Sequence, residues 1–370
     1  MADRTGAVEN LVTNPSFWRG RRVLVTGHTG FKGGWLALWL KKLGAAVSGY
    51  ALPAPTDPSL FELARVGSGV DSNIGDVRDA AKLTDTVRRA RPEVVFHLAA
   101  QPLVRAGYAD PAGTYATNVM GTVNLLEAVR SAGGVRTVVN VTSDKCYENR
   151  EWPWGYRENE PLGGFDPYSS SKACVELVTQ SWRSAFFAPE QHAGHGTALA
   201  TARAGNVIGG GDWGADRLIP DFVRAISNNT PLQIRSPDAV RPWQHVLDPL
   251  AGYLRLAERL YEHGPDVGEA WNFGPATEDA RPVRWVLEQI QRAWPGAAHW
   301  EIDSRPQPHE AALLKLDCSK ARARLGWAPR LPLPLALDWT VEWYKAWRDG
   351  ADMTAVCMDQ IDRYEALAAP

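Results

Sequence analysis

A tyrosine and a lysine, Tyr168 and Lys172, stand four residues apart in a segment that is expected to be helical. Side chains at this spacing lie on one face of a helix, so the two groups can act together. A phenol with a pKa near ~10 is a poor base at neutral pH, but a neighbouring ammonium favours the phenolate and lowers that pKa. The pair therefore predicts proton abstraction by Tyr168, helped by Lys172, which can also hold a ribose hydroxyl.

A second group of reactive side chains, Ser143, Asp144 and Lys145, follows the β-branched run of residues 137–141. Loops at the carboxyl ends of parallel strands carry the chemistry of α/β proteins. Ser143 can donate a hydrogen bond to the same substrate oxygen that Tyr168 deprotonates. Asp144 and Lys145 would place an acid and a potential base beside the reacting group.

Glycines recur every third residue at Gly27, Gly30 and Gly33, directly after the strand-like run of residues 22–26 and before a helix-like segment. Such glycines allow a tight turn, and the N–H groups that begin the helix can bind a diphosphate. The loop therefore predicts a dinucleotide site. The cofactor-binding residues expected here are Gly27, Thr29, Gly30, Phe31, Lys32 and Gly33.

The choice between NAD and NADP depends on the end of the second strand, where residues 50–53 carry neither the usual acid nor an arginine for a 2′-phosphate. NAD is preferred because no cation is present. Asp76 and Val77 follow the third strand, where the Asp76 carboxylate can accept a hydrogen bond from an adenine amino group.

The elements that must position these residues alternate along the chain. Strands are expected at residues 22–26, 46–50, 93–98 and 137–141, with one more that ends at Ile74. Helices are expected at residues 33–43 and 116–130 and from residue 168 toward residue 182. This alternation predicts a Rossmann-type, doubly wound parallel sheet. Proline and glycine become frequent after Arg203, which indicates a smaller α/β substrate domain.

Residues 270–273 read as a late strand that returns to the sheet, so the two domains interleave in sequence. The expected division is a cofactor-binding domain of residues 17–205 and 244–274, a substrate domain of residues 206–243 and 275–350, and terminal extensions of residues 1–16 and 351–370.

Composition favours a small-molecule substrate. The formal net charge is −2 and 22% of the residues are charged, so no basic footprint for nucleic acid is present. The first twenty residues lack the apolar run of a signal peptide, and apolar stretches are too short to span a membrane, so the cytoplasm is the expected location. The four cysteines stand singly and the histidines lack ligand spacing, which indicates reduced thiols and no metal site.

From about residue 17 to 347 the chain resembles the extended short-chain dehydrogenase/reductases and, within them, the CDP-glucose 4,6-dehydratases. The matching motifs are residues 26–33, 97–105, 142–147, 166–169, 203–213, 216–220, 241–245 and 315–320. The resemblance implies dehydration of CDP-D-glucose to CDP-4-keto-6-deoxy-D-glucose with tightly held NAD as an internal hydride store. Tyr168 would take the C4 hydroxyl proton, and Asp144 would protonate the departing C6 hydroxyl.

The resemblance also implies further contacts. For the cofactor these are Asp76, Val77, Leu98, Ala99, Ala100, Gln101, Asn118, Thr142, Tyr168 and Lys172, besides the glycine loop. For the nucleotide sugar they are Gln101, Ser143, Asn206, Arg217, Leu218, Arg235, Arg241, Arg305 and His309, since an arginine fork suits phosphate oxygens. By analogy with relatives, the helices of residues 116–130 and 168–182 would pair in a homodimer or homotetramer.

Lys145 stands where dTDP-glucose dehydratases have a glutamate that removes the C5 proton. A lysine can be that base only if its pKa is depressed; otherwise Lys145 stabilises the enolate and a water or Asp144 moves the proton.

Two rival interpretations stay open. One is a nucleotide-sugar 4-epimerase or a dehydratase of another nucleotide hexose, and the other is a catalytically idle dinucleotide-binding protein. An epimerase does not need the acid and base that Asp144 and Lys145 supply.

Overall fold

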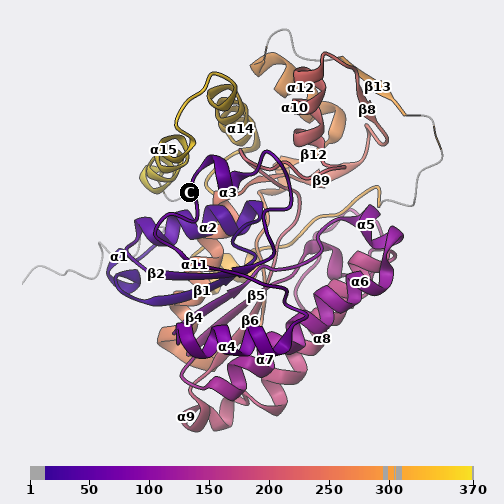
Figure 1. Ribbon diagram of the computed structural model, residues 1–370. Coiled ribbons are helices and arrows are strands. Elements are labelled where there is room, and N and C mark those ends of the chain that lie inside the picture. The colour runs from indigo at the N-terminus through magenta and orange to yellow at the C-terminus, as the bar shows by residue number, and fades with distance from the viewer. Residues whose placement is uncertain (1–12, 295–298, 304, 306–310, 369–370) are drawn as a thin grey trace, which may run out of the picture.

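The computed structural model describes residues 13–294, 299–303, 305 and 311–368. At its centre lies a sheet of seven parallel strands in the order β11-β6-β5-β4-β1-β2-β3 (Figure 1). The strands are β1 (Arg22–Thr26), β2 (Ala46–Ala51), β3 (Asp71–Ile74), β4 (Val94–His97), β5 (Thr137–Val141), β6 (Ala198–Arg203) and β11 (Ala270–Asn272). The predicted doubly wound parallel sheet is confirmed, and the late strand β11 pairs with β6 at the sheet edge.

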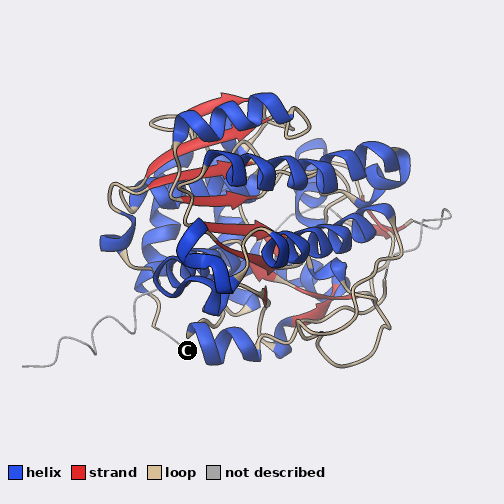
Figure 2. Ribbon diagram, turned by 90° about the horizontal axis from the view of Figure 1, so that it is seen from below, coloured by secondary structure: helices blue, strands red, loops and turns tan. Residues whose placement is uncertain are grey.

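Helices cover both faces of this sheet because successive strand residues point to opposite sides. In β1, Leu24 packs into one core while Val23 and Val25 pack into the other. One face carries α4 (Ala80–Ala90), α7 (Gly121–Ala132) and α8 (Pro167–Ala185), and the other carries α2 (Phe31–Lys42) and α11 (Leu247–His263) (Figures 1 and 2). Strands buried on both faces explain the continuous apolar runs in the sequence.

The helix expected at 116–130 consists of two parts. A π-helical turn, Ala116–Met120, leads into α7, which ends at Gly133 with a φ of +66°. Short helices complete this part of the molecule: α1 (Pro15–Trp18), α3 (Leu60–Leu63), α5 (Val104–Ala109), α6 (Pro111–Tyr115) and α9 (His192–His195). Within the described ranges, no helix is long and apolar enough to cross a bilayer, and acidic, histidine and cysteine side chains form no group that could hold a metal ion.

A smaller group of elements lies beside the sheet, at the upper right of Figure 1. It contains three two-stranded sheets, β10-β7, β12-β9 and β13-β8. Their strands are β7 (Val207–Ile208), β8 (Leu232–Ile234), β9 (Val240–Pro242), β10 (Gln244–His245), β12 (Ala280–Pro282) and β13 (Trp300–Ile302). Helices α10 (Leu218–Asn228) and α12 (Val283–Ala293) belong to this group. Helix α14 (Leu333–Arg348) packs against α12 and β10, and α13 (Ser319–Leu325) packs against α11 and β11.

The segment set apart above as a C-terminal extension contains α15 (Met353–Ala366), which packs against α2 and α14. Its Tyr364 hydroxyl donates to Asp248 Oδ1 over 2.9 Å, and Trp39 Nε1 of α2 donates to Glu365 over 2.7 Å. Helix α15 is therefore part of the core that supports α2.

The buried Asp248 makes stability depend on pH. Burial raises the pKa of Asp248 to about 7, whereas an aspartate in an unfolded chain titrates near ~3.9. Between these values the folded protein holds a proton that the unfolded chain has lost, so stability falls as pH rises and levels off above the folded pKa. We expect the free energy of unfolding of the wild type to fall, relative to Asp248→Asn, by about 1.4 kcal/mol per pH unit.

Urea unfolding of both proteins between about pH 5 and pH 7 measures this difference. Asp238→Asn is the matched control, because the Asp238 side chain is exposed and pairs with Arg284 on the surface. A gap between wild type and Asp248→Asn that stays constant with pH would contradict the assignment of a buried neutral carboxyl.

Candidate active site

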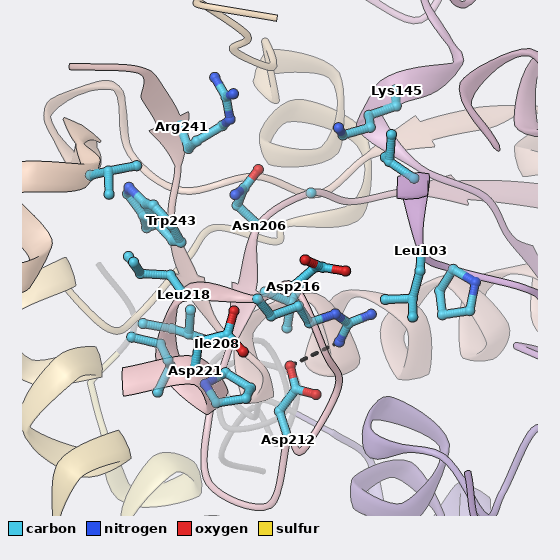
Figure 3. A pocket seen from close by; sticks show the side chains of 18 of the residues that line it. Leu103, Lys145, Asn206, Ile208, Asp212, Asp216, Leu218, Asp221, Arg241 and Trp243 are labelled. Atoms are coloured by element: carbon cyan, nitrogen blue, oxygen red, sulfur yellow. Dashed lines mark hydrogen bonds and ion pairs between the residues drawn. The ribbon is translucent and has the colours of Figure 1, made fainter. Parts of the chain in front are cut away.

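A cavity of about 370 Å³ opens at the carboxyl ends of the parallel strands. One wall is formed by the segments that follow β1, β4, β5 and β6, and the facing wall by α10, β8 and β9 (Figure 3). Its volume suits a small-molecule site. The cavity brings together Phe31, Lys32, Thr142, Ser143, Asp144, Lys145, Tyr168, Asn206, Arg217, Leu218, Arg235 and Arg241, all predicted as site residues.

Helix α8 presents Tyr168 and Lys172 to the end of β5. Its N-cap is Asp166, whose side chain accepts a hydrogen bond from Ser169 N over 3.0 Å, and Pro167 is its first residue. Tyr168 and Lys172 are both buried, and Lys172 Nζ donates to Val141 O over 3.2 Å. The predicted helix face is thus fixed by a capped N-terminus and by a contact to the sheet.

The pKa of Tyr168 is raised in this structure, whereas the sequence predicts that it is lowered. Burial raises the pKa of Tyr168 to about 12, while the Ser143 side chain acts in the opposite direction. Burial also lowers the pKa of Lys172 to about 8. Desolvation is the largest cause for both groups, because burial disfavours the charged form of each.

Ser143 and Asp144 are held together at the end of β5. Ser143 Oγ donates to Asp144 Oδ1 over 3.1 Å and accepts from Lys145 N over 3.2 Å. Asp144 is 2% exposed, and no described residue contacts its Oδ2 by a hydrogen bond. Burial raises the pKa of the Asp144 carboxyl, against the effects of Lys145 and Ser143. A carboxyl in this environment is suited to donate a proton.

Gly205 makes the room for this carboxyl. A Cβ atom at position 205 would lie 1.8 Å from Asp144 Oδ2 and 1.9 Å from Asp144 Cγ. Any other residue at 205 would therefore displace Asp144. The sequence motif contains Gly205, but nothing in the sequence connects it with residue 144.

The glycine loop fits a diphosphate. Helix α2 begins at Phe31 after Gly30, which offers no side chain to cap the first N–H groups. A Cβ atom at Gly33 would lie 2.1 Å from Gly27 O, so only glycine lets the loop close onto the helix. Thr29 Oγ1 donates to Leu52 O over 2.9 Å and ties the loop to the chain after β2.

Lys32 lies among the reactive groups rather than only at the loop. Burial lowers its pKa to about 7, and Lys172 and Arg217 contribute in the same direction, whereas Asp144 and Asp212 oppose it. Its ammonium lies 5.8 Å from the ring centre of Tyr253. Tyr253 is buried on α11 and its hydroxyl has no hydrogen bond among the described residues. The sequence offered no signal for Tyr253.

The other residues expected to bind the cofactor lie along the same edge of the sheet. Asp76 follows β3 and its carboxylate accepts from Arg78, which lowers the pKa of Asp76. Asn118 Oδ1 accepts from Gln101 N over 2.8 Å, and Asn118 Nδ2 donates back to Gln101 O over 3.1 Å. The remaining predicted residues at this edge are Val77 after β3 and Leu98, Ala99 and Ala100 after β4.

The cations predicted for a diphosphate are mostly paired with acids. Arg217 Nη1 lies 2.8 Å from Asp212 Oδ2, the dashed line that ends at Asp212 in Figure 3, and Arg235 Nη1 lies 3.6 Å from Asp216 Oδ1. Neither acid was predicted as a site residue, although each stands within five residues of Arg217 in the matching motifs. Arg241 is buried and donates to two backbone carbonyls, those of Val240 and Ala312.

Two residues predicted to bind the nucleotide sugar, Gln101 and Arg305, do not line this cavity. The Arg305 side chain is 78% exposed, pairs with Asp303 and lines an adjoining cavity of about 280 Å³ together with Arg235. His309 lies outside the described residues. Gln101 is held by Thr114 and Asn118 beside α6.

The chain matches the family described as GDP-mannose 4,6 dehydratase over residues 24–337. It is 56% identical over 349 residues to a CDP-glucose 4,6-dehydratase of Salmonella typhimurium strain LT2, covering 94% of this chain and 97% of that relative. A dTDP-glucose 4,6-dehydratase of Streptomyces antibioticus is 29% identical over 349 residues, which cover 87% of this chain and 92% of that relative.

Among solved structures, a UDP-glucose-4-epimerase from Stenotrophomonas maltophila with bound NAD and formylated UDP-arabinopyranose matches with a TM-score of 0.76 at 22% identity. The match covers 90% of this chain and 100% of that one. At this identity the likeness shows the shared fold alone.

Proposed function

The chain belongs to the GDP-mannose 4,6-dehydratase family. Within this family, we propose that it converts CDP-D-glucose to CDP-4-keto-6-deoxy-D-glucose. The observation that carries this proposal is the 56% identity, over nearly the whole length of both chains, to a CDP-glucose 4,6-dehydratase. The site supports it, because a buried carboxyl beside a tyrosine suits an elimination of water.

The cofactor is NAD, and when bound it would supply reversible hydride acceptance between C4 and C6 of the sugar. The uncapped N-terminus of α2 and the close approach of Gly33 to Gly27 fit its diphosphate. Asp76 follows β3 and Gln101 lies in the segment after β4, where Asn118 holds it; these residues would hold the rest of the molecule.

Tyr168 and Ser143 act at the C4 hydroxyl. Both side chains line the cavity, so a sugar hydroxyl seated between them can pass its proton to Tyr168 Oη while Ser143 orients it. Lys172 lies on the same helix face and stabilises the phenolate that forms.

Asp144 acts at C6. Once C4 is a ketone the C5 proton becomes acidic, and its removal allows the C6 hydroxyl to leave as water. Asp144, with a raised pKa and a buried Oδ2, donates the proton that the leaving oxygen needs. Arg217, Arg235, Arg241 and Asn206 face the same cavity and would hold the diphosphate.

Lys145 is the proposed C5 base. It lines the cavity beside Asp144, on the side where Figure 3 shows Asn206 and Arg241. We expect Lys145→Ala to slow deuterium incorporation at C5 from heavy water by about 10²-fold, because general bases contribute about 10²–10⁴-fold. Mass spectrometry of CDP-glucose and product measures the incorporation, with the exposed Lys82→Ala as control. Incorporation at the wild-type rate would mean that Lys145 only stabilises the enolate.

The reaction itself is tested by mass spectrometry of the protein incubated separately with CDP-glucose, dTDP-glucose and UDP-glucose, with and without added NAD. Loss of one water from CDP-glucose alone is the expected result. An isobaric product would indicate epimerisation. Water loss from dTDP-glucose or UDP-glucose would show that the enzyme dehydrates a hexose carried by another nucleotide. No change with any of the three substrates would indicate an idle dinucleotide-binding protein.

The same proposal covers the arrangement of the protein. Residues 17–205 and 244–274 form the NAD domain, and residues 206–243 and 275–350 form the nucleotide-sugar domain, with the cavity between their strands and helices.

The enzyme acts in the cytoplasm, where its four free cysteines stay reduced. It forms a homodimer or homotetramer through α7 and α8, on which Leu177 exposes a large apolar side chain. Light scattering during gel filtration tests the assembly.

A further inference from the structure

Glu176 on α8 and Arg203 at the end of β6 form an ion pair behind the cavity. Arg203 Nε lies 2.9 Å from Glu176 Oε1 and Nη2 lies 2.9 Å from Oε2, so the pairing is bidentate. The two side chains are 3% and 4% exposed. A buried pair of this kind is costly to desolvate, and removal of one partner leaves an uncompensated buried charge.

What the pair holds is the segment that carries Ser143 and Asp144. Thr142, just before the segment, donates its hydroxyl hydrogen to Glu176 Oε1. Tyr147, just after it, accepts a hydrogen bond of 2.8 Å from Arg203 Nη1 and donates to Asn272 Oδ1 over 2.7 Å. Both ends of the segment are therefore tied to one ion pair.

The same pair joins the other parts of the site. Glu176 lies four residues after Lys172 and eight after Tyr168, hence on the same side of α8. Arg203 is followed two residues later by Gly205, which makes the room for Asp144. The side chain of each partner thus connects the helix that holds the phenol with the loop that holds the carboxyl.

We propose that Glu176 and Arg203 are positioning residues that hold Ser143 and Asp144 at fixed distances from Tyr168. The inference rests on the proposed dehydration. Neither residue touches the substrate in this scheme; each acts through Thr142 or Tyr147. Loosening one end of the segment should slow proton transfer to the C6 oxygen more than it weakens substrate binding, because small displacements of a reacting group reduce the rate steeply.

The test removes one hydroxyl at each end of the segment while leaving the ion pair intact. Tyr147→Phe keeps the stacking of its ring on Tyr156, whose centre lies 5.1 Å away, and Thr142→Val keeps the shape of Thr142. Each is expected to lower kcat for dehydration by about 10-fold with KM for CDP-glucose within about 2-fold. Each should also raise the proportion of substrate molecules that gain deuterium at C5 without losing water.

Thr201→Val is the matched control, because Thr201 donates to the other oxygen of the same carboxylate, over 2.7 Å, from β6 rather than from the catalytic segment. It should destabilise the protein to urea as much as Thr142→Val does and leave kcat within about 2-fold. Thr142→Ser, which restores the hydroxyl, should recover kcat.

Three results would overturn the inference: equal loss of kcat in Thr142→Val and Thr201→Val, a rise in KM with kcat unchanged, or wild-type partition between C5 exchange and water loss in both segment variants. If the wild-type protein does not dehydrate CDP-glucose, the proposed function fails instead.

Discussion

Tyr168→Phe is expected to lower kcat for dehydration of CDP-glucose by about 10²- to 10⁴-fold, the range of a general acid or base. The ring of Tyr168 is buried at the start of α8, and phenylalanine keeps that packing while removing only the hydroxyl. Because the lost group acts on the C4 proton rather than in holding the nucleotide, KM should stay within about 3-fold. Mass spectrometry of timed reactions gives both constants.

Tyr261→Phe is the control for this substitution. Tyr261 lies on α11 away from the cavity, and its hydroxyl donates to Glu93 over 3.3 Å. It should retain the wild-type rate. A Tyr168→Phe enzyme with more than about a tenth of wild-type kcat would show that the C4 proton leaves by another route, for example through Ser143 to water.

Asp144→Asn should separate two steps that the wild type couples. Asparagine keeps the size of the side chain and its bond from Ser143 but cannot donate an acidic proton to the C6 oxygen. We expect dehydration to fall by about 10²- to 10⁴-fold, while deuterium from heavy water still enters C5 of recovered CDP-glucose. Loss of both the exchange and the dehydration would instead assign Asp144 to the C5 proton.

The pH dependence of the same pair of proteins gives a second measurement. Burial raises the pKa of Asp144, and the acid must be protonated to act. The wild-type rate of water loss should therefore fall as the pH rises through that pKa. The residual rate of Asp144→Asn should not fall over the same pH range.

Gly205→Ala should reproduce much of the Asp144→Asn phenotype without changing any group that takes part in the chemistry. The added methyl would meet Asp144 Oδ2 at 1.8 Å, so the carboxyl must move. The expected loss of kcat is about 10²-fold, the size reported for displacements near 1 Å. Gly194→Ala on α9, where an added Cβ would meet no atom within 4 Å, is the comparison. Equal activity of Gly205→Ala and wild type would mean that the position of Asp144 does not limit the rate.

Much of the fold follows from local pattern. The predicted strands at 22–26 and 137–141 coincide with β1 and β5, because β-branched residues buried on both faces leave a continuous apolar run. The glycine loop and the pair Tyr168 and Lys172 could be predicted because their spacing fits within one turn or one helix face.

Other features depend on segments far apart in the sequence and could not be predicted. The contact of Gly205 with Asp144 joins β6 to β5, and the bonds from Glu176 to Thr142 and Arg203 join three elements. The prediction of a lowered pKa for Tyr168 was wrong for a related reason. Its rise to about 12 comes from burial by the surrounding fold, which a sequence spacing of four residues does not reveal.

The pairing of β11 with β6 has a consequence for synthesis. Strand β6 is buried along its length, yet the strand that covers its outer edge follows about 70 residues later. At about 5–20 residues per second, a ribosome needs roughly 4 to 14 s to make that stretch. During this interval the nascent sheet presents an open apolar edge, which favours pairing with other chains. Expression at low temperature or with limiting chaperones should therefore reveal aggregation that the finished enzyme does not show.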